Sequence, residues 1–107
     1  MQFGIIINSN DPETVWNAFR FGLQPLANGD GVKVFLTGKG VEAEQLDTEK
    51  FPVTEMMKEL QELGGEVFCC GSCSQKIRGI NPTLCPVGGM KDMYRIIVES
   101  DSCHGAA

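Results

Sequence analysis

Histidine is almost absent from this sequence: His104 is the only one in 107 residues, beside one tryptophan and one tyrosine. A single histidine excludes a metal site built from several imidazoles. Long apolar runs are also missing, because the first run, residues 5–7, is far shorter than the roughly 20 residues of a membrane-spanning helix. No basic residue precedes that run. We therefore expect no secretory signal and a cytoplasmic protein.

Basic side chains are scarce as well, with 9 lysines and arginines against 14 acidic residues and a net charge of −5. A protein that binds nucleic acid or an anionic membrane needs a basic face, so we expect neither partner. The composition is 42% hydrophobic and 21% charged, which is enough apolar material for a folded core. The length predicts a single domain over residues 1–107.

Alternating apolar and helical segments predict an α/β domain with a mostly parallel sheet. The short apolar runs are typical of strands buried on both faces. We expect Asp11 and Thr54 to cap helices, and Pro25 to break or kink the first helix. The tail, residues 101–107, is weakly apolar but is a candidate for one more strand. Predicted strands are 3–8, 32–36 and 66–70, and predicted helices begin after residues 11, 40, 54 and 90.

Ligands of parallel sheets bind at the carboxyl ends of the strands. Three loops are expected there, at residues 8–11, 37–40 and 70–79. The loop at 37–40, Thr-Gly-Lys-Gly, lacks the full phosphate-binding pattern, which favours a plain strand-to-helix turn over an anion site. We recognise no flavin phosphate site in these loops and expect no cofactor.

The third loop carries a CxxC pair, Cys70 and Cys73, and is the densest functional signal. Thiols stay reduced in the cytoplasm, so this spacing indicates metal binding or thiol chemistry before a structural disulfide. A helical turn from Ser72 onward would lower the pKa of a nearby thiol, and Lys76 and Arg78 would add positive charge. Both effects favour the nucleophilic thiolate.

Three interpretations of the five cysteines remain open. Some fill the core as small apolar residues, with Cys69 and Cys103 the strongest candidates. Alternatively, four ligands hold zinc. In the third interpretation the CxxC pair carries persulfide sulfur or cycles between dithiol and disulfide. The zinc ligands would be Cys70, Cys73, Cys85 and either Cys103 or His104.

The chain resembles the DsrE/DsrF-like family of small sulfur-relay proteins over nearly its whole length. The resemblance rests on residues 3–18, 32–42, Cys70-Gly71-Ser72-Cys73 and Ile77-Arg78-Gly79. It implies a flavodoxin-like three-layer sandwich, a homo-oligomer, and sulfur donor and acceptor proteins as partners. It places persulfide chemistry on Cys70 or Cys73, with Arg78 in the same loop. The polar tail and the extra thiol of Cys69 depart from the family pattern.

The leading hypothesis is therefore a cytoplasmic, sulfurtransferase-like sulfur carrier that uses Cys70, Cys73 and Arg78 and needs no cofactor. The alternative is a non-catalytic oligomeric binding module whose cysteines are structural or hold zinc.

Overall fold

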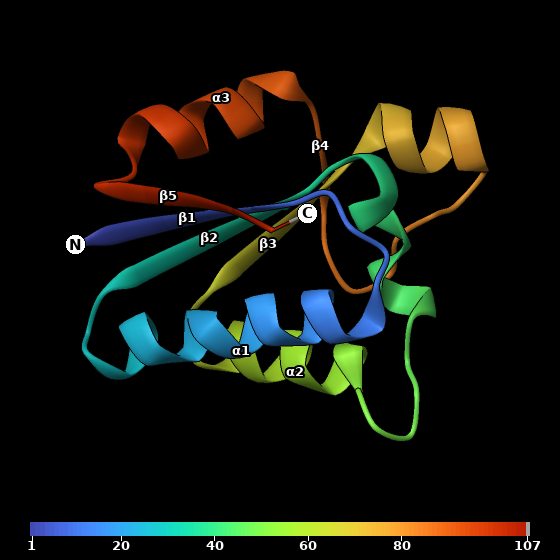
Figure 1. Ribbon diagram of the computed structural model, residues 1–107. Coiled ribbons are helices and arrows are strands. Elements are labelled where there is room, and N and C mark those ends of the chain that lie inside the picture. The colour runs from blue at the N-terminus through green and yellow to red at the C-terminus, as the bar shows by residue number, and fades with distance from the viewer. Residues whose placement is uncertain (107) are drawn as a thin grey trace.

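A computed structural model describes residues 1–106 and shows one five-stranded sheet in the order β4-β3-β2-β1-β5, with every pair of neighbours parallel. Figure 1 shows α1 and α2 on one face of the sheet and α3 on the other, so the predicted three-layer α/β sandwich is confirmed. The elements are β1 (Gln2–Ile7), α1 (Pro12–Ala27), β2 (Gly31–Leu36), the 3₁₀ helix η1 (Gly38–Gln45), α2 (Val53–Glu62), β3 (Glu66–Cys70), the π-helical turn η2 (Ser72–Lys76), β4 (Val87–Gly88), α3 (Met90–Glu99) and β5 (Ser102–Ala106).

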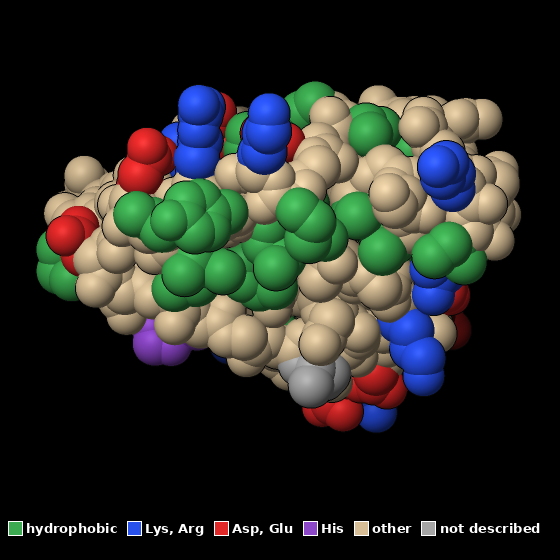
Figure 2. Space-filling model, turned by 90° about the horizontal axis from the view of Figure 1, so that it is seen from above, with side chains coloured by type: hydrophobic (Ala, Val, Ile, Leu, Met, Phe, Trp, Pro, Cys, Tyr) green, Lys and Arg blue, Asp and Glu red, His purple; other side chains and the backbone are tan. Residues whose placement is uncertain are grey.

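The core lies between the central strands and the α1 and α2 helices. The carboxyl-terminal half of strand β2 is buried on both faces, because Val34, Phe35 and Leu36 are all essentially inaccessible to solvent. Helices α1 and α2 add Phe19 and Met57, which are equally buried. The α3 face is different: a band of apolar side chains stays at the surface over this helix (Figure 2). Among residues 1–106, no helix is both long and apolar enough to cross a membrane.

Of the three local predictions about helix ends, the Asp11 cap is confirmed, the Thr54 cap is wrong, and the break expected as one outcome at Pro25 does not occur. Asp11 caps α1 as expected, accepting a 2.9 Å hydrogen bond from the Thr14 amide. Thr54 does not cap α2, which already begins at Val53; the Thr54 amide instead donates to Asp47 at 2.8 Å. Pro25 does not break α1, which continues to Ala27. Because Pro25 lies in the last turn, its missing N–H removes only one late helical bond.

The polar tail forms strand β5, so the expected last strand is present. It pairs in parallel with the central strand β1, with Gly4 opposite Cys103. His104 is therefore part of the sheet and not of a disordered tail: it lies in β5, and its Nε2 is 2.7 Å from the Ser102 hydroxyl. Backbone hydrogen bonds to a buried neighbour stabilise a strand that its own side chains do not predict.

Candidate thiol site

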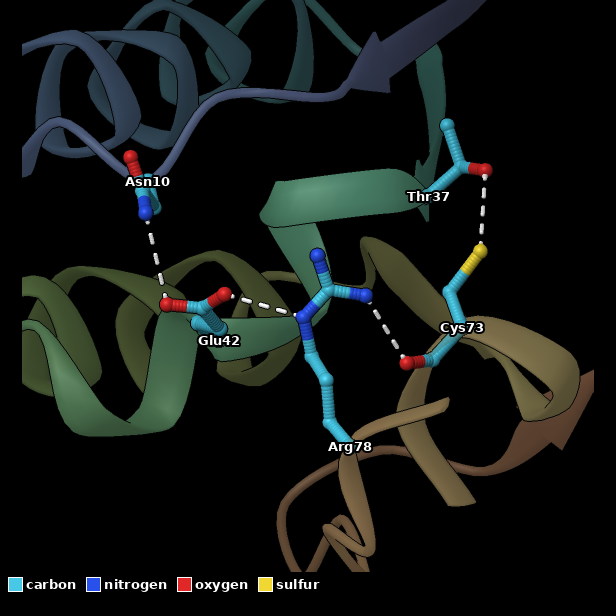
Figure 3. A network of polar contacts seen from close by, with 5 residues as sticks. All are labelled: Asn10, Thr37, Glu42, Cys73 and Arg78. Carbon is cyan, nitrogen blue, oxygen red and sulfur yellow. Dashed lines mark hydrogen bonds and ion pairs between the residues drawn. The ribbon is translucent and has the colours of Figure 1, made fainter. Parts of the chain in front are cut away.

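Three loops that follow β1, β2 and β3 meet at the carboxyl edge of the sheet, as predicted. Figure 3 shows Asn10, Thr37 and Cys73 from these loops, joined through Glu42 and Arg78. The parallel topology brings together residues that are more than sixty positions apart in the sequence. The candidate site is therefore a product of the sheet order and of the short turns that leave each strand.

Cys73 is the partly exposed thiol of this edge. It lies in η2, and its Sγ is 3.9 Å from the Thr37 hydroxyl oxygen. Burial raises the pKa of Cys73, but hydrogen bonds from the Gly38 amide, the Cys70 thiol and the Thr37 hydroxyl, with the charge of Arg78, outweigh it. The net effect lowers the pKa of Cys73 below its ordinary value of 9.0. The site thus favours a thiolate.

The turn at residues 37–40 supplies these donors. Gly38 has a φ of 54°, in the left-handed region that favours glycine. Gly40 lies so close to β1 that an added Cβ would be 2.1 Å from the Ile7 carbonyl oxygen. The two glycines explain this motif as a tight strand-to-helix turn, as predicted, and the turn directs the Gly38 amide at the Cys73 sulfur.

Arg78 holds the Cys73 backbone in place. Its Nη1 donates to the Cys73 carbonyl oxygen at 3.0 Å, and its Nε donates to Glu42 Oε2 at 2.9 Å (Figure 3). Asn10 Nδ2 donates to the other Glu42 oxygen at 3.3 Å. The hydrogen bond from Arg78 lowers the pKa of the Glu42 carboxyl, so this anchor stays ionised. We did not single out Glu42 from the sequence, because its partner lies 36 residues away.

Lys76 does not play the expected part. Its side chain is exposed, and among the described residues the groups that shift the Cys73 pKa do not include it. Of these two cations, only Arg78 helps to lower the pKa of Cys73.

Cys70 lies behind Cys73 and is only 2% exposed. Its thiol helps to lower the pKa of Cys73, while its carbonyl oxygen accepts a 2.8 Å bond from the buried Ser74 hydroxyl. The CxxC residues are therefore neighbours of unequal access. A reagent from solvent meets Cys73 first.

The DsrE/DsrF-like family model matches residues 1–102 of the chain. The chain belongs to the DsrE/DsrF-like family. An uncharacterised protein of Methanocaldococcus jannaschii is 33% identical over 111 residues, which covers 95% of this chain and 96% of that protein. An uncharacterised protein of Methanopyrus kandleri is 34% identical over 97 residues, which covers 84% and 79%. Family membership suggests a sulfur-relay role. The two relatives are uncharacterised and do not indicate a sulfur donor or acceptor.

This DsrE/DsrF-like protein holds a second thiol pair that sequence reasoning did not recognise. Cys69 and Cys85 are both buried, and the Cys85 Sγ is 4.0 Å from Glu44 Oε2. The Cys85 thiol lowers the pKa of Cys69, whereas the Cys69 thiol, burial and the Glu44 carboxylate raise the pKa of Cys85. Glu44 also accepts a 2.7 Å bond from the Thr83 hydroxyl. Cys85 therefore interacts with Cys69 and not with Cys70 or Cys73 among the groups that shift its pKa.

The four zinc ligands considered in the sequence analysis do not lie together in the structure. Cys103 and His104 lie on β5, at the opposite edge of the sheet from β4 and three strands from Cys70. At about 4.8 Å between neighbouring strands, that separation is roughly 14 Å. No three or more His, Cys, Asp or Glu side chains within residues 1–106 are arranged to hold a metal ion. Cys103, considered as a core residue, is exposed.

Proposed function

We propose that this protein is a cytoplasmic sulfur carrier in which the Cys73 thiolate takes up and passes on sulfane sulfur. The single observation that carries the proposal is the position of Cys73: a partly exposed thiol at the carboxyl edge, with its pKa lowered by surrounding donors. A free thiol of this kind is the usual nucleophile of sulfur exchange. All five cysteines, which lie within the described residues, are free, as a reducing compartment requires.

Uptake transfers one sulfur atom from the donor to Cys73 and needs no oxidant or reductant. The Cys73 thiolate attacks the outer sulfur of a donor persulfide; the new S–S bond forms as the donor S–S bond breaks, and the donor leaves as a thiolate. An acceptor thiolate then attacks the outer sulfur of the Cys73 persulfide and regenerates the Cys73 thiolate. Donor and acceptor proteins with exposed cysteines would be the partners. The Gly38 amide and the Thr37 hydroxyl are placed to stabilise negative charge on Cys73 sulfur in both states.

Cys70 offers a second outcome from the same persulfide. Attack of the Cys70 thiolate on the Cys73 sulfur would form a Cys70–Cys73 disulfide and expel the outer sulfur as hydrosulfide. The effect of the Cys70 thiol on the pKa of Cys73 supports this resolving step. Arg78 touches the Cys73 carbonyl oxygen and is proposed as a positioning residue.

The test is intact-mass measurement of reduced protein after incubation with a sulfane-sulfur donor such as an inorganic polysulfide. We expect adducts that are about 32 Da heavier, retained in Cys103→Ser and lost in Cys73→Ser. Cys103 is the matched control, because it is the other thiol open to solvent. Equal adducts on wild type and on the Cys70→Ser/Cys73→Ser variant would refute the proposal.

A second candidate is the oligomeric binding module, in which the thiols only support the structure. The exposed apolar surface of α3 favours some form of association. A homo-oligomer is compatible with both candidates. The adduct measurement separates them, because a binding module would form no specific adduct on Cys73.

A further inference from the structure

The three loops at the carboxyl edge differ in charge from the rest of the chain. They are residues 8–11, 37–40 and 70–79. These loops contain three basic residues and one acidic residue, whereas the whole chain has 9 basic and 14 acidic residues. The basic residues are Lys39, Lys76 and Arg78, and the acidic residue is Asp11. The surroundings of the thiol site are therefore positive on a protein whose net charge is −5.

Two of these cations are free to meet a partner. Lys39 follows Gly38, whose amide is directed at the Cys73 sulfur. Lys76 follows Cys73 by three residues in η2. Figure 3 shows the Cys73 sulfur directed from η2 to the Thr37 end of η1, so the two lysines stand on the two elements that meet at the thiol. Both lysines are exposed, and within residues 1–106 neither forms an ion pair.

The acidic groups that belong to this edge are already bound within the protein. The Asp11 carboxylate accepts hydrogen bonds from the amide and the hydroxyl of Thr14, at 2.9 and 2.8 Å. Glu42, which joins the loops, binds Arg78 and Asn10, as described above. These contacts occupy both carboxylates, whereas the two lysines keep their charge for solvent or for a partner.

Two exposed apolar side chains lie at the same edge. Ile77, between Lys76 and Arg78 in the chain, is 72% exposed. Val87 in β4 is 43% exposed and lies beside Gly71, where an added Cβ would be 2.8 Å from the Val87 Cγ1. A small inorganic sulfur compound has no use for such side chains, whereas a polypeptide can cover them with apolar side chains of its own. They favour a polypeptide as the occupant of this surface.

We propose that the proteins which exchange sulfur with Cys73 present their cysteine within an acidic segment. This segment docks on Lys39 and Lys76 and covers Ile77 with an apolar side chain. The inference rests on the sulfur chemistry proposed above and adds the charge class of the partner. The net charge of −5 makes the opposite prediction, because it attracts basic segments from a distance. Local charges dominate within about 8–10 Å, the Debye length near physiological salt.

The experiment compares three synthetic peptides that differ only in charge. Each contains a Leu-Cys pair flanked by glutamates, glutamines or lysines, with the cysteine activated as a mixed disulfide with 2-thiopyridine. The Cys73 thiolate attacks the peptide sulfur; a new S–S bond forms, the old one breaks, and pyridine-2-thione leaves, which absorbance records. All proteins carry Cys103→Ser, because this substitution removes the other thiol open to solvent.

The ranking of the three rates tests the charge of the surface. In about 0.1 M salt we expect the acidic peptide to react about tenfold faster than the basic peptide. In about 1 M salt, where the Debye length falls to about 3 Å, the ratio should fall below about twofold. A basic peptide that reacts faster, or a ratio that salt does not change, would overturn the proposal.

Charge reversal assigns the preference to the two lysines. Lys39→Glu and Lys76→Glu should each lower the acidic-to-basic rate ratio at least about threefold. Lys58→Glu is the matched control, because Lys58 is exposed on α2 and its substitution changes the charge equally. The ratio is compared because a shift in the pKa of Cys73 changes both rates alike. Ratios that fall equally in Lys39→Glu and Lys58→Glu would contradict the assigned surface.

Two further measurements separate the docking contact from the chemistry. Ile77→Ser should slow all three peptides about threefold and leave the ratio unchanged, and wild-type rates for this variant would refute the apolar contact. The glutamine peptide tests the thiol itself, with Cys73→Ser as its blank. If no peptide modifies Cys73, the proposed sulfur chemistry fails; if all three modify it at one rate, only the acidic partner is refuted.

Discussion

Gly40→Ala is the substitution that most directly tests how the fold shapes the thiol site. In the native structure, the new methyl carbon would be 2.1 Å from the Ile7 carbonyl oxygen and 2.8 Å from its carbon. Ordinary contacts for such atoms begin near 3.4 Å. The obstructing atoms are backbone of the central strand β1, so the 37–40 turn has to move by about 1 Å instead.

Two effects should follow from that displacement. Overpacking against backbone costs about 2–4 kcal/mol in the free energy of unfolding. For a domain of this size, such a loss lowers the melting temperature by roughly 10–20 °C. The Gly38 amide and the Thr37 hydroxyl move with the turn, so the pKa of Cys73 should rise toward its ordinary value.

The measurements are urea unfolding and the rate of Cys73 alkylation by iodoacetamide as a function of pH. Gly105→Ala is the matched control, because Gly105 lies in strand β5 and a Cβ there meets nothing within 4 Å. The control should keep wild-type stability and reactivity. Unfolding free energies that agree between Gly40→Ala and Gly105→Ala would refute the steric reasoning. Loss of stability with unchanged Cys73 reactivity would refute the role given to the turn.

Three further results are expected. Arg78→Lys cannot bond Glu42 and the Cys73 carbonyl together, so urea unfolding should show a loss of about 1 kcal/mol and alkylation of Cys73 should slow; unchanged values would contradict the positioning role. Because the pKa of Cys73 is lowered on folding, its stabilising contribution is complete above the ordinary value of 9.0 and disappears as pH falls through the lowered folded-state pKa. The stability difference between wild type and Cys73→Ser should therefore grow with pH below 9.0 under reducing conditions, and a constant difference would exclude a shifted thiol. Glu44→Gln weakens the anchor of Thr83, which should lower stability by about 1–2 kcal/mol and speed proteolysis of residues 77–84, whereas a protease-resistant loop would argue against that anchor.

The sequence by itself determined the α/β class, the order of most elements and the three loops at the carboxyl edge. These features follow from local patterns: buried apolar runs such as residues 32–36, the Asp11 cap, and helical spacing in residues 90–99. It also placed Cys70, Cys73 and Arg78 in one loop. Local patterns were a poor guide at two helix ends. Pro25 does not break α1 because it lies in the last turn of that helix, and Thr54 does not cap α2 because its amide bonds to Asp47.

Only the tertiary structure decided which residues meet at the site and what each contributes. The parallel sheet joins Asn10, Glu42 and Arg78, and it brings the Gly38 amide to the Cys73 sulfur. The same topology separated Cys103 from the other thiols by placing β5 at the far edge. Sequence spacing carries no information about such contacts, because they depend on strand order and on turn geometry between segments tens of residues apart. The chemistry of Cys73 is therefore a property of the assembled edge of the sheet.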